Sequence, residues 1–243
     1  MPKLTRYHFY TVRAYAVHLY TSLGLIAALL AMGALISGDI VKVLIFLGIS
    51  MAIDSTDGTM ARAWKVTTWA SGVDGRKLDD ITDYITYAFI PVVFAYRFGM
   101  VHGLGILVLC LVLIFGAYGF VRKTAKTHDG FFTGFPNFWN LLVFYLYIFH
   151  ATPTANALIM LFFALMIFVP IKYVSYSTRA MRPLTVVMSL LYGLNLAAIL
   201  WTWDAPDIRL RLASISMIFP VYYTALSLYL HFKKEEDEVL FAK

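Results

Sequence analysis

The chain has 243 residues, of which 60% are hydrophobic and 14% are charged, with a mean hydropathy of +0.74. This composition leaves no room for a large soluble domain. It predicts an all-α integral membrane protein, with residues 1–243 forming one polytopic domain of about eight spans of ~20 residues each. The formal net charge is +6. The basic residues gather at the ends of apolar runs, where they orient a protein and meet anionic lipid, so we exclude nucleic acid as a partner.

Apolar runs of helix length alternate with charged or turn-forming residues along the chain. Residues 1–16 are basic and aromatic, which predicts a short amphipathic helix lying at the membrane surface. The mixed charges of residues 233–243 predict a solvated C-terminal tail. The predicted spans between them are 17–37, 40–62, 79–96, 101–121, 137–150, 154–174, 183–201 and 211–232.

The distribution of Lys and Arg predicts the orientation in the membrane. An even number of spans puts both termini on one side. Only four of the 20 Lys and Arg residues then fall on the opposite side, namely Lys42, Arg97, Arg209 and Arg211. Because positive charge concentrates on the cytoplasmic side, we expect both termini and the polar connection between the second and third spans to face the cytoplasm.

That polar connection carries six of the chain's 14 acidic residues within positions 54–83. Asp54 and Asp57 are three residues apart, and Asp79 and Asp83 are four apart, so each pair lies on one face of a helix. Carboxylates beside membrane spans cost several kcal/mol unless they are paired or bind metal. If the two runs form a hairpin, the pairs face each other and supply four oxygen ligands suited to two Mg²⁺ or Mn²⁺ ions.

Glycine and basic residues near these aspartates suit a phosphorylated substrate. Gly58 allows backbone to approach a ligand closely. Arg62 offers a planar fork of donors for phosphate oxygens. Lys65, Arg76 and Lys77 add positive charge for a polyanion.

The same stretch resembles the signature of the CDP-alcohol phosphotransferases, integral membrane enzymes of phospholipid synthesis. The residue types of that signature stand here at Asp54, Asp57, Gly58, Ala61, Arg62, Gly75, Asp79 and Asp83. The family usually has eight residues between the arginine and the second glycine, whereas this chain has twelve, residues 63–74. The longer connection, VHLYTSLG at 17–24 and FFTGFPNFWN at 131–140 are similar to the branch of bacterial phosphatidylcholine synthases.

The resemblance implies a CDP-alcohol phosphotransferase fold, embedded as a multi-pass protein in the bacterial inner (cytoplasmic) membrane. It implies transfer of a phosphatidyl group from CDP-diacylglycerol to choline with release of CMP, assisted by two Mn²⁺ or Mg²⁺ ions. It further implies a homodimer among membrane lipids. Asp54, Asp57 and Asp79 would be metal ligands, and Asp83 would be both a nearby ligand and the general base.

Substrate contacts are also expected from the resemblance. The nucleotide and its phosphates would contact Gly58, Arg62, Gly75, Thr21 and Lys65. The quaternary ammonium of choline is bound by aromatic faces and carboxylates because it has no hydrogen-bond donor. The candidates for choline binding are Tyr84, Tyr87, Phe135, Trp139 and Asn140.

Two alternatives remain open from the sequence. The acceptor alcohol could be glycerol phosphate, serine or inositol phosphate, since a phosphorylated acceptor needs a basic cluster. Such a cluster is available from Arg122, Lys123, Lys126, Arg179 and Arg182. A transporter using intramembrane acids is less favoured, because the acids are confined to one hairpin and no charged path crosses the membrane.

Overall fold

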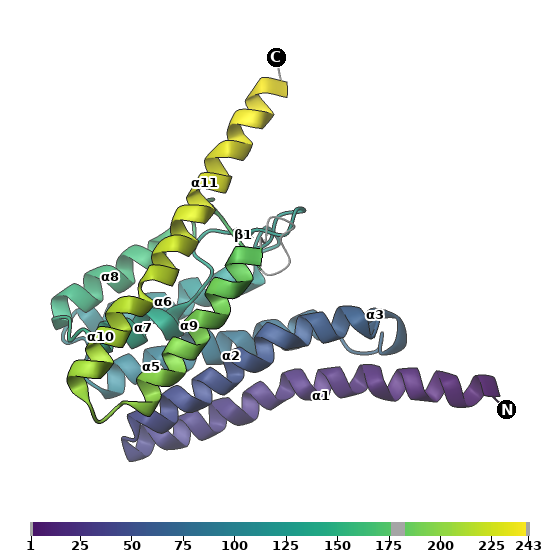
Figure 1. Cartoon of the computed structure of the whole chain (residues 1–243), viewed down its shortest axis with the longest axis horizontal. Coiled ribbons are helices and arrows are strands. Elements are labelled where there is room, and N and C mark those ends of the chain that lie inside the picture. The colour runs from purple at the N-terminus through teal and green to yellow at the C-terminus, as the bar shows by residue number, and fades with distance from the viewer. Residues whose placement is uncertain (1, 176–182, 242–243) are drawn as a thin grey trace. The chain divides into compact units, whose positions relative to one another are not determined.

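The computed structural model describes residues 2–175 and 183–241, with side chains from Tyr7 to Ser175 and from Pro183 to Lys233. Within these ranges the chain folds as helices and a single two-stranded sheet (Figure 1). It divides into two compact units, Met1–Arg97 and Phe98–Lys243. The predicted basic residues Arg179 and Arg182 lie outside the described residues.

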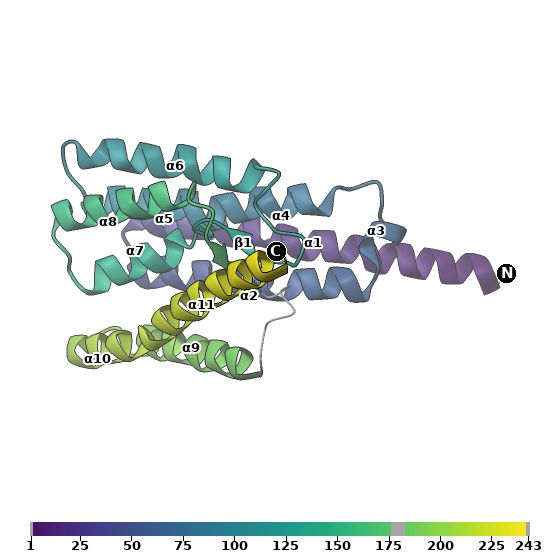
Figure 2. The ribbon, with the colours of Figure 1, turned by 90° about the horizontal axis from the view of Figure 1, so that it is seen from above.

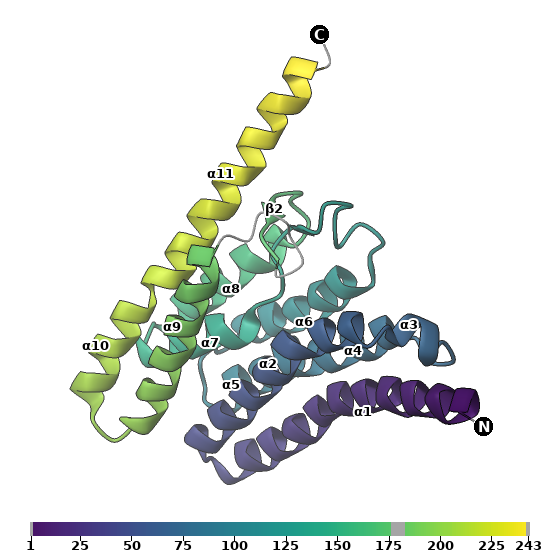
Figure 3. The ribbon, with the colours of Figure 1, turned by 45° about the vertical axis from the view of Figure 1, so that its right-hand side comes forward.

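The first unit contains the aspartate-rich stretch. Its elements are α1 (Pro2–Ser37), α2 (Ile40–Ala63), α3 (Val66–Trp69), α4 (Gly75–Asp83), the π-helical η1 (Tyr84–Phe89) and α5 (Ile90–Arg97). The long helices α1 and α2 run side by side in opposite directions (Figures 1 and 3).

Two residues between α1 and α2 end one helix and begin the next. Gly38 has φ +75°, a left-handed conformation in which glycine carries no Cβ penalty. The N–H groups of Gly38 and Asp39 donate to the carbonyls of Leu35 and Ala34, which closes α1 with a Schellman motif. The Asp39 carboxylate then accepts the backbone N–H of Lys42 and caps α2.

The segments α4, η1 and α5 follow one another without a break from Gly75 to Arg97. Asp74 caps the start by accepting the backbone N–H of Lys77 at 3.2 Å. This hydrogen bond holds the pKa of Asp74 below its usual value. The π-helical turn begins directly after Asp83, and such turns are frequent at functional sites.

Small residues let α1 approach its neighbours closely. Its buried positions include Ala27, Ala28, Ala31 and Ala34. At Gly24 an added Cβ would lie only 2.6 Å from Thr82 Cγ2 of α4, so this position has no space for a side chain. Small residues at helix interfaces are the usual means of close packing between membrane helices.

Residues 2–16 are not a separate helix, because α1 runs unbroken from Pro2 to Ser37. Their location at the membrane surface stays a prediction. The N-terminal part of α1 packs on α3 through aromatic contacts. Tyr10 stacks on Trp69 with ring centroids 5.0 Å apart. The Arg13 guanidinium lies 5.2 Å from the ring centroids of both Tyr10 and Trp64. These cation–π contacts hold the N-terminal part of α1 beside the end of α2, and the Tyr10–Trp69 stack holds it beside α3.

The second unit consists mainly of helices and contains one short two-stranded sheet. Its elements are α6 (Gly105–Val121), β1 (Phe132–Thr133), α7 (Trp139–Ile148), α8 (Pro153–Met166), β2 (Lys172–Tyr173), α9 (Pro183–Trp201), α10 (Pro206–Ser216) and α11 (Ile218–Phe241). Helices α6 and α8 lie alongside each other (Figure 2), and α9 packs against α10 and α11.

The antiparallel sheet was not predicted from the sequence. Phe132 pairs with Tyr173, and Thr133 pairs with Lys172. Gly134 follows with φ +75° and donates its N–H to the carbonyl of Ile171. The helix predicted over 154–174 therefore ends at Met166, because the residues after it pair with the loop that follows α6.

Within the described ranges, three helices are long and apolar enough to cross a membrane: Tyr7–Ser37, Pro183–Trp201 and Pro206–Lys233. The helical, apolar character expected of a membrane protein is thus confirmed, and α9 has the predicted bounds of 183–201. The third of these stretches, Pro206–Lys233, consists of α10 followed by α11, and the span predicted at 211–232 falls on both. The total of eight spans stays a prediction.

Candidate metal centre and active site

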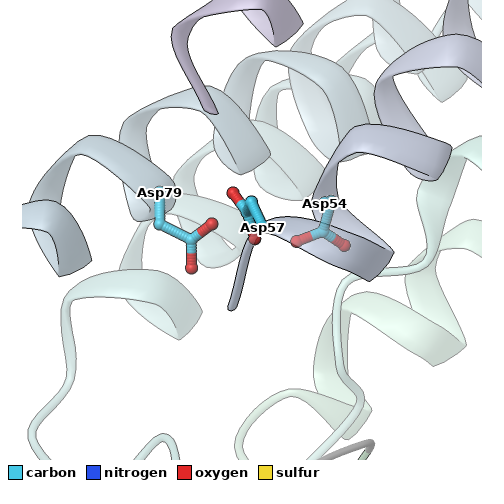
Figure 4. Close-up of side chains that lie close together, drawn as sticks. All are labelled: Asp54, Asp57 and Asp79. Carbon is cyan, nitrogen blue, oxygen red and sulfur yellow. The ribbon is translucent and has the colours of Figure 1, made fainter. Parts of the chain in front are cut away.

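Three of the four motif aspartates come together in the first unit. Asp54 and Asp57 lie on α2 and Asp79 lies on α4, and one carboxylate oxygen from each is within 4.8 Å of the others. Figure 4 shows the three side chains turned toward one another. The prediction that the two ends of the polar connection face each other is confirmed for these residues. Asp83 is one helical turn after Asp79, within the electrostatic field of Asp54, Asp79 and Asp57.

This arrangement has a large electrostatic cost unless a cation offsets it. Two carboxylates 4.8 Å apart repel by roughly 3–4 kcal/mol at an effective dielectric constant of about 20. Asp57 is buried, whereas Asp54 and Asp79 are half-buried, so water screens the repulsion only partly. Clustered carboxylate oxygens are the ligands that Mg²⁺ and Mn²⁺ prefer. The three residues therefore fit a divalent cation.

Two hydroxyl groups hold the carboxylates of α2. Thr21 Oγ1 on α1 donates to Asp57 Oδ2 at 2.7 Å. The Tyr87 hydroxyl on η1 donates to Asp54 Oδ2 at 2.8 Å. The sequence suggested other roles for these residues, a nucleotide contact for Thr21 and a choline contact for Tyr87. Pairing with the aspartates was missed, because the partners are 36 and 33 positions apart and no local spacing indicates them.

The predicted phosphate-binding residues Gly58 and Arg62 lie one turn apart on α2, beside the aspartates. Arg62 Nη2 donates to Thr59 Oγ1 at 3.0 Å, and a Cβ at Gly58 would lie 3.4 Å from Arg62 Nη1. The Arg62 charge acts on Asp57. Lys65 is exposed just after the end of α2, in a left-handed conformation with φ 51°.

Gly75 begins α4 and packs against a histidine of α1. A Cβ at Gly75 would lie 2.7 Å from His18 Cε1, which leaves this position open only to glycine unless the ring moves. His18 is 8% exposed, and its Nε2 has no hydrogen-bond partner among the described residues. Gly75 thus sets the contact between α1 and α4, a role that the sequence did not reveal.

The remaining candidates for choline binding divide between the two units. Tyr84 begins η1, directly after Asp83. Phe135 and Trp139 lie in the core of the second unit, with ring centroids 5.2 Å apart. Trp139 is fully buried and donates its Nε1–H to Asn137 Oδ1. The structure gives these two rings a packing role, and their contact with choline stays a prediction.

Asn137 and Asn140 of the FFTGFPNFWN segment form hydrogen bonds with backbone groups outside it. Asn137 adopts φ 59°, a left-handed conformation that asparagine tolerates better than most residues. Its amide nitrogen lies 3.4 Å from the carbonyl of Gly116 on α6, which ties the segment to that helix. Asn140 Oδ1 accepts the N–H of Leu141 at the start of α7. A choline contact of Asn140 likewise stays a prediction.

Comparison with known proteins identifies relatives over most of the chain. It is 34% identical over 225 residues to the phosphatidylcholine synthase of Borreliella burgdorferi, covering 91% of this chain and 96% of that protein. The phosphatidylcholine synthase of Legionella pneumophila is 32% identical over 225 residues, with 89% and 88% covered. That of Pseudomonas aeruginosa is 31% identical over 182 residues, with 74% and 76% covered. No protein-family model matches. With this identity over nearly full length, and with the aspartate cluster in place, the chain belongs to the phosphatidylcholine synthase family.

Proposed function

We propose that this protein is a phosphatidylcholine synthase that transfers the phosphatidyl group of CDP-diacylglycerol to choline and releases CMP. The observation that carries the proposal is the cluster of Asp54, Asp57 and Asp79 in a chain that belongs to this family. The apolar helices supply a membrane setting in which a lipid donor is available.

The reaction exchanges one bond at phosphorus for another. The choline hydroxyl oxygen bonds to the phosphatidyl phosphorus, the bond from that phosphorus to the CMP oxygen breaks, and the hydroxyl proton passes to a base. In the proposal Asp83 accepts that proton, because it lies beside the cluster without belonging to the three-carboxylate group. Arg62 and Lys65 hold phosphate oxygens by charge-assisted hydrogen bonds, and Gly58 and Gly75 line the nucleotide side.

The three clustered carboxylates would hold the divalent ions, with Asp83 beside them. Mn²⁺ or Mg²⁺ held there would offset negative charge on the pyrophosphate and on the leaving CMP. The same acidic surroundings favour the approach of a quaternary ammonium, and the ring of Tyr84 beside Asp83 offers an aromatic face for it. We further propose a homodimer in the bacterial inner membrane, with the site open to the cytoplasm.

The test is release of CMP by the protein purified in detergent. CDP-diacylglycerol, Mn²⁺ and choline are supplied together, and each is omitted in turn. Release should require all three, and Asp79→Asn should reduce it by at least 100-fold. Asp39→Asn is a matched control, because Asp39 pairs with Lys42 at the other end of α2. Release that proceeds equally with another alcohol and without choline would overturn the proposed acceptor.

A further inference from the structure

Hydroxyl groups from two different helices fix the two ligand carboxylates of α2. Thr21 on α1 is 7% exposed and Tyr87 on η1 is 6% exposed. The hydrogen bond from Thr21 to Asp57 is buried, and that from Tyr87 to Asp54 is partly buried. Each hydroxyl donates to one oxygen, Oδ2 of Asp57 or of Asp54. Each hydroxyl thereby orients the whole carboxylate through Oδ2. Because a hydroxyl carries no charge, it holds the carboxylate without replacing a cation as its counter-charge.

Thr21 differs from the other threonine and serine residues of α1 whose side chains the structure describes. Threonine and serine in helices commonly donate to the carbonyl of the preceding turn. The adjacent residue does so, since Ser22 Oγ donates to the carbonyl of His18 at 2.8 Å, and Thr11 donates to that of Tyr7 at 3.0 Å. Thr21 instead donates across the helix interface to Asp57. Its hydroxyl therefore serves the carboxylate and not its own backbone.

Tyr87 holds the second carboxylate, that of Asp54, from η1. Its ring is buried, and its hydroxyl reaches Asp54 from the π-helical turn that begins one residue after Asp83. A ring that binds choline needs one exposed face. A ring that positions Asp54 needs only its hydroxyl within hydrogen-bond distance of the carboxylate. The observed geometry, with 2.8 Å between the two oxygens, fits the second role.

We propose that Thr21 and Tyr87 are positioning residues of the metal centre, which orient the Asp57 and Asp54 carboxylates toward a divalent cation. The inference rests on the proposed function, because it concerns the same aspartates. Partners that orient metal ligands typically change metal affinity by about 10–100-fold when they are removed. We expect the requirement for Mn²⁺ to rise by that factor in Thr21→Val and in Tyr87→Phe, each of which removes one hydroxyl at nearly constant size.

The experiment measures Mn²⁺ binding directly, without substrates, from the electron paramagnetic resonance signal of free Mn²⁺ at the purified protein. Thr21→Ser keeps a hydroxyl and should retain most of the affinity. Matched controls are Ser22→Ala, whose hydroxyl bonds its own helix, and Tyr96→Phe, whose side chain is exposed on α5. Both controls should bind Mn²⁺ like the wild type. The KM for choline and for CDP-diacylglycerol is then measured at saturating Mn²⁺.

The two positions give separable outcomes. Weakened Mn²⁺ binding with an unchanged KM for both substrates supports the positioning role. Unchanged Mn²⁺ binding in both variants overturns it. In that case a raised KM for choline in Tyr87→Phe would make Tyr87 a choline contact, and a raised KM for CDP-diacylglycerol in Thr21→Val would make Thr21 a nucleotide contact.

A wild type that binds Mn²⁺ but releases no CMP with choline would instead refute the proposed function. If Thr21→Val fails to fold, Thr21→Ala removes the same hydroxyl without adding bulk, and Tyr87→Phe tests the second hydroxyl independently.

Discussion

Replacing Gly24 by alanine tests how closely α1 and α4 must pack for the metal centre to form. The added Cβ would lie 2.6 Å from Thr82 Cγ2, whereas carbon atoms in contact are best separated by about 3.5–4.0 Å. The two helices must therefore move apart by about 1 Å, or Thr82 must change its rotamer. Thr82 precedes Asp83 on α4, and Thr21 on the same helix as Gly24 holds Asp57, so separation of the helices distorts the carboxylate cluster.

The expected cost follows from overpacking of a close helix contact. Inserting a methyl group into a well-packed interior costs about 1–3 kcal/mol. For a chain of this size that corresponds to a fall in Tm of roughly 2–12 °C. Alanine is otherwise the better helix former, by about 1 kcal/mol, so the substitution would stabilise the protein wherever space is available. The sign of the change in Tm therefore reports the contact.

The assay is thermal unfolding in detergent, followed by tryptophan fluorescence, together with Mn²⁺ affinity. Gly33→Ala is the matched control, because a Cβ at Gly33 on the same helix meets nothing within 4 Å. Gly33→Ala should leave Tm unchanged or raise it. Adding Thr82→Ser to Gly24→Ala removes Cγ2 and should recover most of the lost Tm. Equal Tm values for Gly24→Ala and Gly33→Ala, or no recovery in the double variant, would refute the reasoning.

Three further predictions address other contacts. Gly75→Ala should lower Tm and Mn²⁺ affinity because its Cβ would lie 2.7 Å from His18 Cε1, and His18→Ser in the same protein should restore both; failure to restore them would contradict the contact. Trp139→Ala removes a fully buried side chain and should cost about 3–5 kcal/mol in unfolding experiments. If the predicted choline contact holds, the folded fraction also shows a raised KM for choline, and an unchanged KM would contradict that contact. The pKa of Asp74 is lowered in the folded protein by its hydrogen bond from Lys77, so its contribution to stability is present above the unfolded pKa and is lost as the pH falls below about 4. The difference in Tm between the wild type and Asp74→Asn should therefore vanish on acidification, and a difference independent of pH would contradict it.

Patterns within single helices made part of this protein predictable. Aspartates three and four positions apart at the ends of apolar runs indicated a shared face and an oxygen site, and Asp54, Asp57 and Asp79 do converge. The apolar run at 183–201 gave the bounds of α9. These features follow from the repeat of one helix and from the cost of placing charge beside apolar spans, which are properties of local sequence.

The contacts between segments were decided by the tertiary structure. The hydroxyls of Thr21 and Tyr87 reach aspartates more than 30 residues away, because the rotation of α1 and the π-helical turn of η1 set where those side chains point. Position 24 accommodates only glycine because Thr82 of α4 occupies the space that a Cβ would need. Sequence determined the chemistry of the carboxylates and the helical elements that carry them. Which neutral groups hold the carboxylates depends on how closely the helices approach and how they are rotated, and that is a property of the folded protein alone.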